Sequence, residues 1–88
     1  MTKTEFFEKC DAVADSFCNV NTKQGATVGS LNIANALNQI FFEIKKLQSA
    51  VYYGQEETVS EENEKKLADY AEKLEKWTVA IDAMIELL

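Results

Sequence analysis

The stretch SLNIANALNQIFFEIKKLQSAVYY, residues 30–53, carries a very regular apolar pattern. Its large apolar residues alternate spacings of four and three, at Ile33, Leu37, Ile40, Ile44, Leu47 and Val51. This alternation places them on one face of an α-helix and is typical of helices that pack along a shared seam. Ser30 is a suitable N-cap, and Gly54 is suited to the position after the last helical residue. We therefore predict a helix over residues 30–53.

A second seam follows after a short turn, which we place at residues 54–59. The same alternation of spacings runs to the last residue, through Leu67, Tyr70, Leu74, Trp77, Ile81, Met84 and Leu88. Thr58 with Glu61 has the spacing of a capping box, and Ser60 is an alternative N-cap. We predict a helix over residues 60–88, antiparallel to the preceding helix because the turn between them is short.

The N-terminal segment has a shorter apolar stripe. Phe6, Cys10, Val13 and Phe17 recur at helical spacing, and Thr2 with Glu5 forms another capping-box pair. The following NVNTKQGATVGS is rich in Asn and Gly, which favour loops. We predict a helix over residues 3–18 and a loop over residues 19–29.

These elements make residues 1–88 one all-α domain. The predicted fold is a small three-helix bundle, in which a long antiparallel helical hairpin packs against a shorter N-terminal helix. A short first helix would leave apolar faces of the hairpin uncovered, and uncovered faces of this kind indicate association with another copy or another protein.

The charge distribution restricts the class of partner. The formal net charge is −6, and every basic residue is a lysine. Residues 21–54 carry three Lys and one Glu, whereas residues 55–88 carry four Lys and ten acidic residues. The negatively charged phosphate backbone of a nucleic acid repels such an acidic chain. Proteins that bind nucleic acids also rely heavily on the guanidinium group of arginine, which can donate two hydrogen bonds to one phosphate or base. We therefore expect no direct nucleic-acid binding, and a basic protein surface is the better partner.

The residues that usually carry enzymatic chemistry are scarce. The chain has no histidine, the commonest general base and metal ligand. Cys10 and Cys18 lie eight residues apart, too far along one helix for a disulfide and without the spacing of a zinc site. The glutamates of residues 56–64 lack the alternating pattern of an EF-hand loop. We expect no enzyme activity and no metal site.

Two further signals bear on cofactor and compartment. Ser30 and Leu31 are similar to part of the Asp-Ser-Leu motif of acyl carrier proteins, but Gly29 stands in place of the aspartate. We therefore expect no cofactor. The N-terminal residues mix acids with apolar residues, unlike a signal peptide, and no apolar run approaches a membrane span. We expect a cytoplasmic protein without membrane contact.

The stretch VYYGQEETVSEENE, residues 51–64, supplies the candidate partner-binding site. The candidate residues are Phe42, Tyr52, Tyr53, Glu56, Glu57, Glu61, Glu62 and Glu64. Acidic residues in the first turn of a helix stabilise its positive end by about 0.3–1 kcal/mol each. This stabilisation largely explains why Glu61, Glu62 and Glu64 are present at these positions. The turn itself needs neither the tyrosine pair nor Glu56 and Glu57.

Three functional classes fit these observations. The first is a non-enzymatic acidic inhibitor or antagonist that occupies a basic or nucleic-acid-binding surface of a partner, as small phage anti-defence proteins of similar size and charge do. The second is a helical-hairpin structural subunit, self-assembling or heteromeric, or a secretion chaperone. The third is a transcription-related or antitoxin-like regulator that acts through protein contacts.

Overall fold

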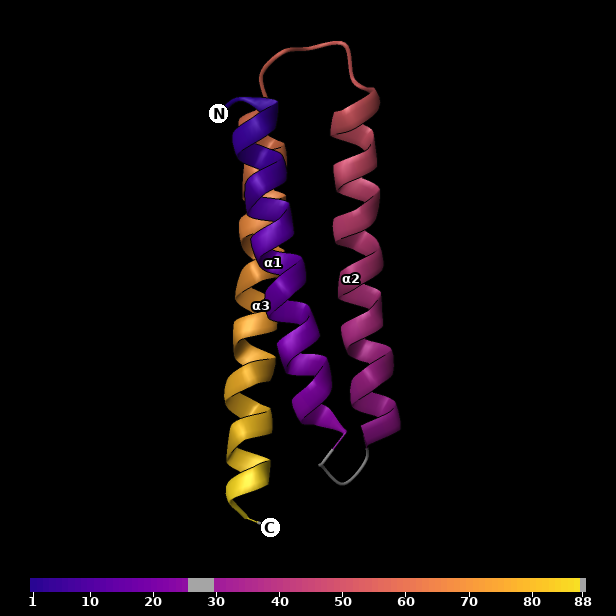
Figure 1. The fold of residues 1–88 in the computed structure, drawn as a ribbon, viewed down its shortest axis with the longest axis vertical. Helices are drawn as coiled ribbons and strands as arrows, with labels where there is room; N and C mark the ends of the chain where they lie inside the picture. Colours follow the sequence, from indigo (N-terminus) through magenta and orange to yellow (C-terminus); the bar gives the residue numbers. More distant parts are fainter. Residues whose placement is uncertain (26–29, 88) are drawn as a thin grey trace.

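The computed structural model describes residues 1–25 and 30–87. In this part the chain forms three helices, α1 (Lys3–Gln24), α2 (Ser30–Tyr53) and α3 (Glu61–Glu86). They form an elongated bundle of 49 × 17 × 17 Å, in which α1 and α3 run in one direction and α2 runs in the other (Figure 1). The predicted all-α three-helix bundle with an antiparallel hairpin is confirmed.

The α2 helix has the predicted bounds and the predicted core face. All the seam residues from Ile33 to Val51 are buried. At the end of the helix the Gly54 amide donates to the Val51 carbonyl oxygen at 3.2 Å. A Cβ on Gly54 would lie 3.3 Å from the Ala50 carbonyl oxygen, so glycine avoids a tight contact there. The predicted capping by the Ser30 side chain and the predicted loop residues 26–29 lie outside the described residues.

The predicted end of the first helix at Cys18 is wrong, because α1 continues to Gln24. Val20 lies three residues after Phe17, continues the apolar stripe, and is only 3% exposed. The Thr22 hydroxyl donates to the Cys18 carbonyl oxygen at 2.9 Å within the added turn. Burial of Val20 therefore outweighs the loop preference of the asparagines on either side of it. The α1 helix has 22 residues, α2 has 24 and α3 has 26, so α1 is still the shortest of the three. It is nevertheless long enough to pack along most of α2.

The α3 helix begins after Ser60, whose Oγ accepts from the Asn63 amide at 3.3 Å. Ser60 is thus the cap, and Thr58 pairs with Thr2 in an isolated antiparallel β-bridge instead. Only alternate members of the predicted seam are buried, namely Leu67, Leu74 and Ile81. The intervening Tyr70, Trp77 and Met84 are half-buried or exposed. Tyr70 and Trp77 nevertheless pack against the core as partly buried residues, so the predicted seam faces the bundle, although it is fully buried only at every seventh residue. Leu88, the last predicted member of the seam, lies outside the described residues.

The N-terminal residues hold the α2–α3 turn against the bundle. The Val59 amide donates to the Met1 carbonyl oxygen at 2.9 Å, and the Lys3 ammonium donates to the Gly54 carbonyl oxygen at 2.6 Å. The Met1 amino group is 2.6 Å from a carboxylate oxygen of Glu64. Figure 1 shows the N-terminus lying beside the start of α3, at the turn end of the bundle. These contacts position the residues of the turn relative to α1.

None of the helices in the described ranges has the length and hydropathy that crossing a membrane requires.

Candidate functional site

The exposed aromatic residues at the end of α2 form a row with a residue of α1. Val51 is the last seam residue of α2, so Tyr52 and Tyr53 point away from the core and are 65% and 81% exposed. The Tyr52 ring lies 6.2 Å from the ring of Phe7. The Tyr53 ring meets Tyr52 edge-on, with centroids 5.0 Å apart. Aromatic pairs at these separations are favourable, so Phe7 supports the Tyr52 ring, and Tyr52 helps to hold the Tyr53 ring in place.

A hollow of about 220 Å³ lies beside this aromatic row. It is lined by Phe7, Gln48, Ser49, Tyr52 and Tyr53. The amide, hydroxyl and phenol groups on its walls can form hydrogen bonds, and the rings offer apolar area. Such a combination is typical of the aromatic anchor points of protein interfaces.

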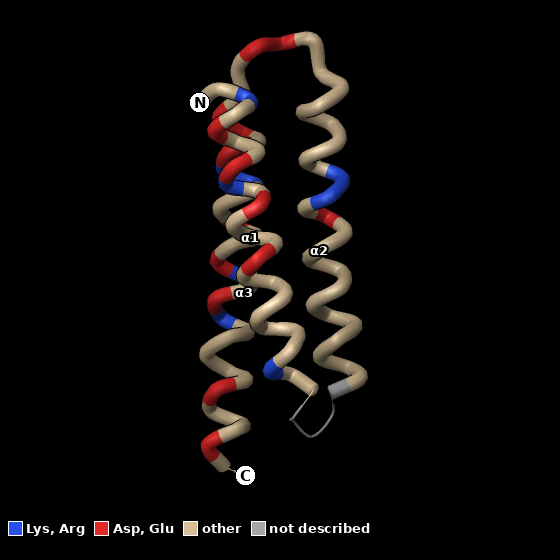
Figure 2. Tube along the Cα trace, viewed as in Figure 1, with Lys and Arg blue, Asp and Glu red and all other residues tan. Residues whose placement is uncertain are grey.

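The acidic residues of the turn lie next to the tyrosines. Glu56 and Glu57 follow Tyr53 by three and four residues, and both are exposed. Within the described part of the chain neither carboxylate makes an ion pair. Figure 2 shows this acidic segment on the turn, at the end of the bundle where α3 also begins with acidic residues. We call Phe7, Tyr52, Tyr53, Glu56 and Glu57 together the turn surface.

The three other candidate glutamates lie in the first turn of α3. Glu64 is half-buried and holds the Met1 amino group, so it stabilises the fold of the turn. Glu62 is paired with Lys66 at 3.5 Å on the surface of the helix. Glu61 is exposed beside them. Their shared position fits the predicted role at the positive end of the helix, and Glu61 and Glu62 also extend the acidic area of the turn surface.

Phe42 is separated from the other candidates. It lies eleven residues before Tyr53, which corresponds to about 16 Å along the helix axis. The side chain is 63% exposed, and its ring neighbours Phe41, which stacks on Phe17 at 4.7 Å. Because eleven residues make about three helical turns, Phe42 and Tyr53 nevertheless lie on the same side of α2.

Three residues near the site were missing from the candidates. Phe7 is next to the buried Phe6. The sequence indicates its position only indirectly, because Phe7 makes the apolar stripe of the first helix wider than the core requires. Lys45 and Lys46 are adjacent lysines between Phe42 and the tyrosines, in the one segment with a positive charge balance. The Lys45 ammonium lies 5.4 Å from the Phe41 ring centre, and the Lys46 ammonium is 3.9 Å from a Glu43 oxygen.

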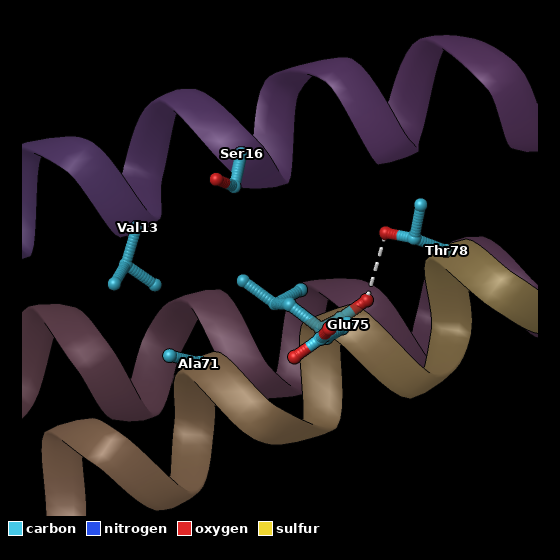
Figure 3. A pocket seen from close by; sticks show the side chains of 6 residues that line it. Val13, Ser16, Ala71, Glu75 and Thr78 are labelled. Carbon is cyan, nitrogen blue, oxygen red and sulfur yellow. Dashed lines mark hydrogen bonds between the residues drawn. The ribbon is translucent and has the colours of Figure 1, made fainter.

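The hollows between α1 and α3 have a different character. One has a volume of about 300 Å³ and is lined mainly by small and apolar residues, among them Val13, Ser16 and Ala71 (Figure 3). The Thr78 hydroxyl at its edge donates to the Leu74 carbonyl oxygen at 2.9 Å, as Figure 3 shows. Glu75 supplies its carboxylate. The lining residues are therefore mostly apolar or small, and Glu75 is the one titratable residue among them.

Metal ligands and thiols are the remaining side chains of the bundle that could carry chemistry. Residues 1–25 and 30–87 contain no group of three or more Cys, Asp or Glu side chains that could hold a metal ion. Cys10 lies in the core, whereas Cys18 is exposed. Burial, together with the nearby charge of Asp11, raises the pKa of Cys10 to about 11, although Lys45 acts in the opposite direction. A thiol with so high a pKa is protonated and weakly nucleophilic at neutral pH.

Comparison with protein-family models, with characterised proteins and with solved structures finds no match for this chain.

Proposed function

We propose that this protein acts without enzymatic chemistry, by binding a basic surface of another protein through its turn surface. The supporting observation is the exposed Tyr52–Tyr53 pair, supported by Phe7 and followed directly by Glu56 and Glu57. Well-supported aromatic rings supply contact area at low entropic cost, and nearby carboxylates steer a basic partner into place. A protein that covers such a surface would act as an inhibitor or antagonist of whatever else binds there.

The exposure of these residues has no explanation in the fold of the monomer. The turn is already held by Met1, Lys3 and Ser60, and the core ends at Val51. Two large aromatic side chains on the surface carry a solvation cost that partner binding would relieve. The acidic surface also makes a nucleic-acid partner unfavourable, which is why we propose a protein.

The test begins with capture of a partner on the immobilised protein, followed by kinetic measurements on the purified pair. We expect Tyr52→Ser with Tyr53→Ser to weaken binding by at least about tenfold, mainly through faster dissociation. Charge reversal by Glu56→Lys with Glu57→Lys should slow association, and higher salt should slow it in the unaltered protein too.

Matched controls separate this surface from general effects of charge and hydrophobicity. Glu72→Lys with Glu75→Lys makes the same change in net charge on exposed positions of α3, and Val79→Ser removes an exposed apolar side chain elsewhere. Both controls should bind like the unaltered protein. Equal losses in controls and turn-surface variants, or no loss in either, would contradict the proposal.

A further inference from the structure

The outer side of α2 combines a basic pair with exposed aromatic and small residues. Phe42, Lys46, Ser49 and Tyr53 follow one another at spacings of four, three and four, so they lie along one line of the helix surface. Lys45 lies at the edge of this line. All these residues are exposed, and the Lys46 side chain is 77% exposed. We call Phe42, Lys45, Lys46, Ser49 and Tyr53 together the α2 outer face.

We propose that the partner of the turn surface is the α2 outer face of a second copy of this chain. The two copies would pair about a twofold axis, with their α2 helices antiparallel and crossing at Ser49. Such an isologous contact uses the same patch on both copies. Self-pairing rests on the proposed function, because it keeps the turn surface as the binding site, and narrows it, because the second copy supplies the basic protein surface. Any other protein that binds the turn surface would then compete with the second copy.

The register follows from positions along the helix. Lys46 and Tyr52 lie three residues on either side of Ser49, and Lys45 and Tyr53 lie four residues on either side. In an antiparallel crossing at Ser49, the two lysines of each copy therefore come opposite the two tyrosines of the other, about 4.5–6 Å from the twofold axis as measured along the helix. An ammonium group over a tyrosine ring is a favourable cation–π contact.

The turn carboxylates complete the contact. Glu56 and Glu57 lie just beyond the tyrosines and make no ion pair within the described residues. A lysine side chain can lay its apolar stem along the hollow beside Ser49 and Tyr52 and carry its ammonium group onward to a turn carboxylate. The twofold axis repeats this arrangement, so each pair of copies gains two sets of complementary charges.

The charge of the whole chain singles out this face for self-pairing. Two copies of charge −6 repel each other at long range, so a stable contact needs a locally complementary patch. In α3 the acidic residues outnumber the four lysines, and two of those lysines are paired within the helix, Lys66 with Glu62 and Lys76 with Glu72. In α2 the adjacent Lys45 and Lys46 form the blue segment in Figure 2, and the one acidic residue of that helix, Glu43, lies 3.9 Å from the Lys46 ammonium group. Two lysines against one glutamate leave α2 with a positive charge balance. The small Ser49 at the crossing point lets the helices approach closely.

A charge-swap experiment tests the pairing by sedimentation over a wide range of concentrations. We expect the unaltered protein to dimerise. Lys45→Glu with Lys46→Glu, and separately Glu56→Lys with Glu57→Lys, should each weaken self-association by about tenfold or more, because like charges then face each other. An equimolar mixture of the two variants should form a heterodimer, since both sets of charges are then opposite again.

Two control variants have the same changes in net charge at other exposed positions. Lys73→Glu with Lys76→Glu, and Glu72→Lys with Glu75→Lys, should dimerise like the unaltered protein. All of the substitutions are at exposed or half-exposed surface positions, and circular dichroism verifies that each variant keeps its helices. A monomeric unaltered protein, or a mixture that does not form heterodimers, would overturn self-pairing. The proposed function would then be tested separately by the binding of a captured partner. That binding should be weakened by substitution of Tyr52 and Tyr53 and left unchanged by substitution of Lys45 and Lys46.

Discussion

At the residue scale, the two cysteines show how position on a helix determines chemistry. Cys10 occupies a seam position of α1 and is 1% exposed, whereas Cys18, eight residues later, is exposed. Burial is the main cause of the raised pKa of Cys10, about 11. Its thiol therefore stays protonated in the folded protein under conditions in which an exposed thiol begins to ionise.

We predict that a thiol-alkylating reagent at mildly alkaline pH modifies Cys18 quickly and Cys10 slowly. The thiolate is the reacting species, so Cys10 should become reactive only as the pH approaches 11 or when the bundle unfolds. Because the unfolded chain releases this proton near pH 9.0, the Cys10 contribution to stability is complete below that pH and is lost as the pH rises toward 11. Mass spectrometry of a time course follows both sites, and Cys18→Ser isolates Cys10. Rapid modification of Cys10 in the folded protein would contradict its placement in the core.

The acidic residues also differ in what their sequence positions predict. The location of Glu61, Glu62 and Glu64 in a first helical turn was predictable from the capping residues before them. The ion pair between Glu64 and the Met1 amino group joins residues far apart in the sequence, so helical periodicity could not predict it. Glu64 consequently belongs more to the fold of the turn than to its exposed surface.

At the scale of elements, agreement between several local signals decided which boundaries could be predicted. For α2 the apolar seam and the following Gly54 indicate the same end, and the predicted and observed bounds coincide. For α1 the signals conflict, because the asparagines favour a loop whereas Val20 continues the apolar stripe. The position at which α1 ends depends on whether another helix buries Val20, and this cannot be predicted from the local sequence.

We predict that Val20→Ala destabilises the protein by roughly 1–2 kcal/mol, because it removes two buried methyl groups. Asn19→Ala, at an exposed neighbouring position, should be neutral or slightly stabilising, since alanine favours helix more than asparagine does. Urea unfolding followed by circular dichroism measures both. If the helix instead ended at Cys18, Val20→Ala would have almost no effect on the free energy of unfolding.

The seam of α3 shows the limit of periodicity as a guide to burial. Spacings of three and four identify the side of the helix that faces its neighbours, but not how wide the buried strip is. In this narrow bundle Leu74 and Ile81 fill the core, whereas Trp77 lies at its edge. The number and spacing of the neighbouring helices determine that width.

At the scale of the whole molecule, the fold was predictable because three amphipathic segments with short connections allow few arrangements. The candidate site was predictable only in part. Tyr52, Tyr53, Glu56 and Glu57 are close in sequence, and their exposure followed from the end of the seam at Val51. The contribution of Phe7 required knowledge of how α1 lies against α2, and that depends on packing between segments distant in sequence.

The turn surface is the proposed site of contact between this protein and its partner. The most direct measurement uses a photoreactive benzophenone amino acid placed at Tyr53 and, as the control, at Val79, since both positions are well exposed and Val79 lies on another helix. Irradiation of cells that produce each variant would be followed by separation of the products by mass.

We predict a discrete crosslinked product from position 53 that is lost with Glu56→Lys and Glu57→Lys, and no corresponding product from position 79. A product of twice the mass of the chain would identify the second copy, and any other discrete mass a different protein. If position 53 gave no product, or if both positions gave the same products, the turn surface would not be the binding site.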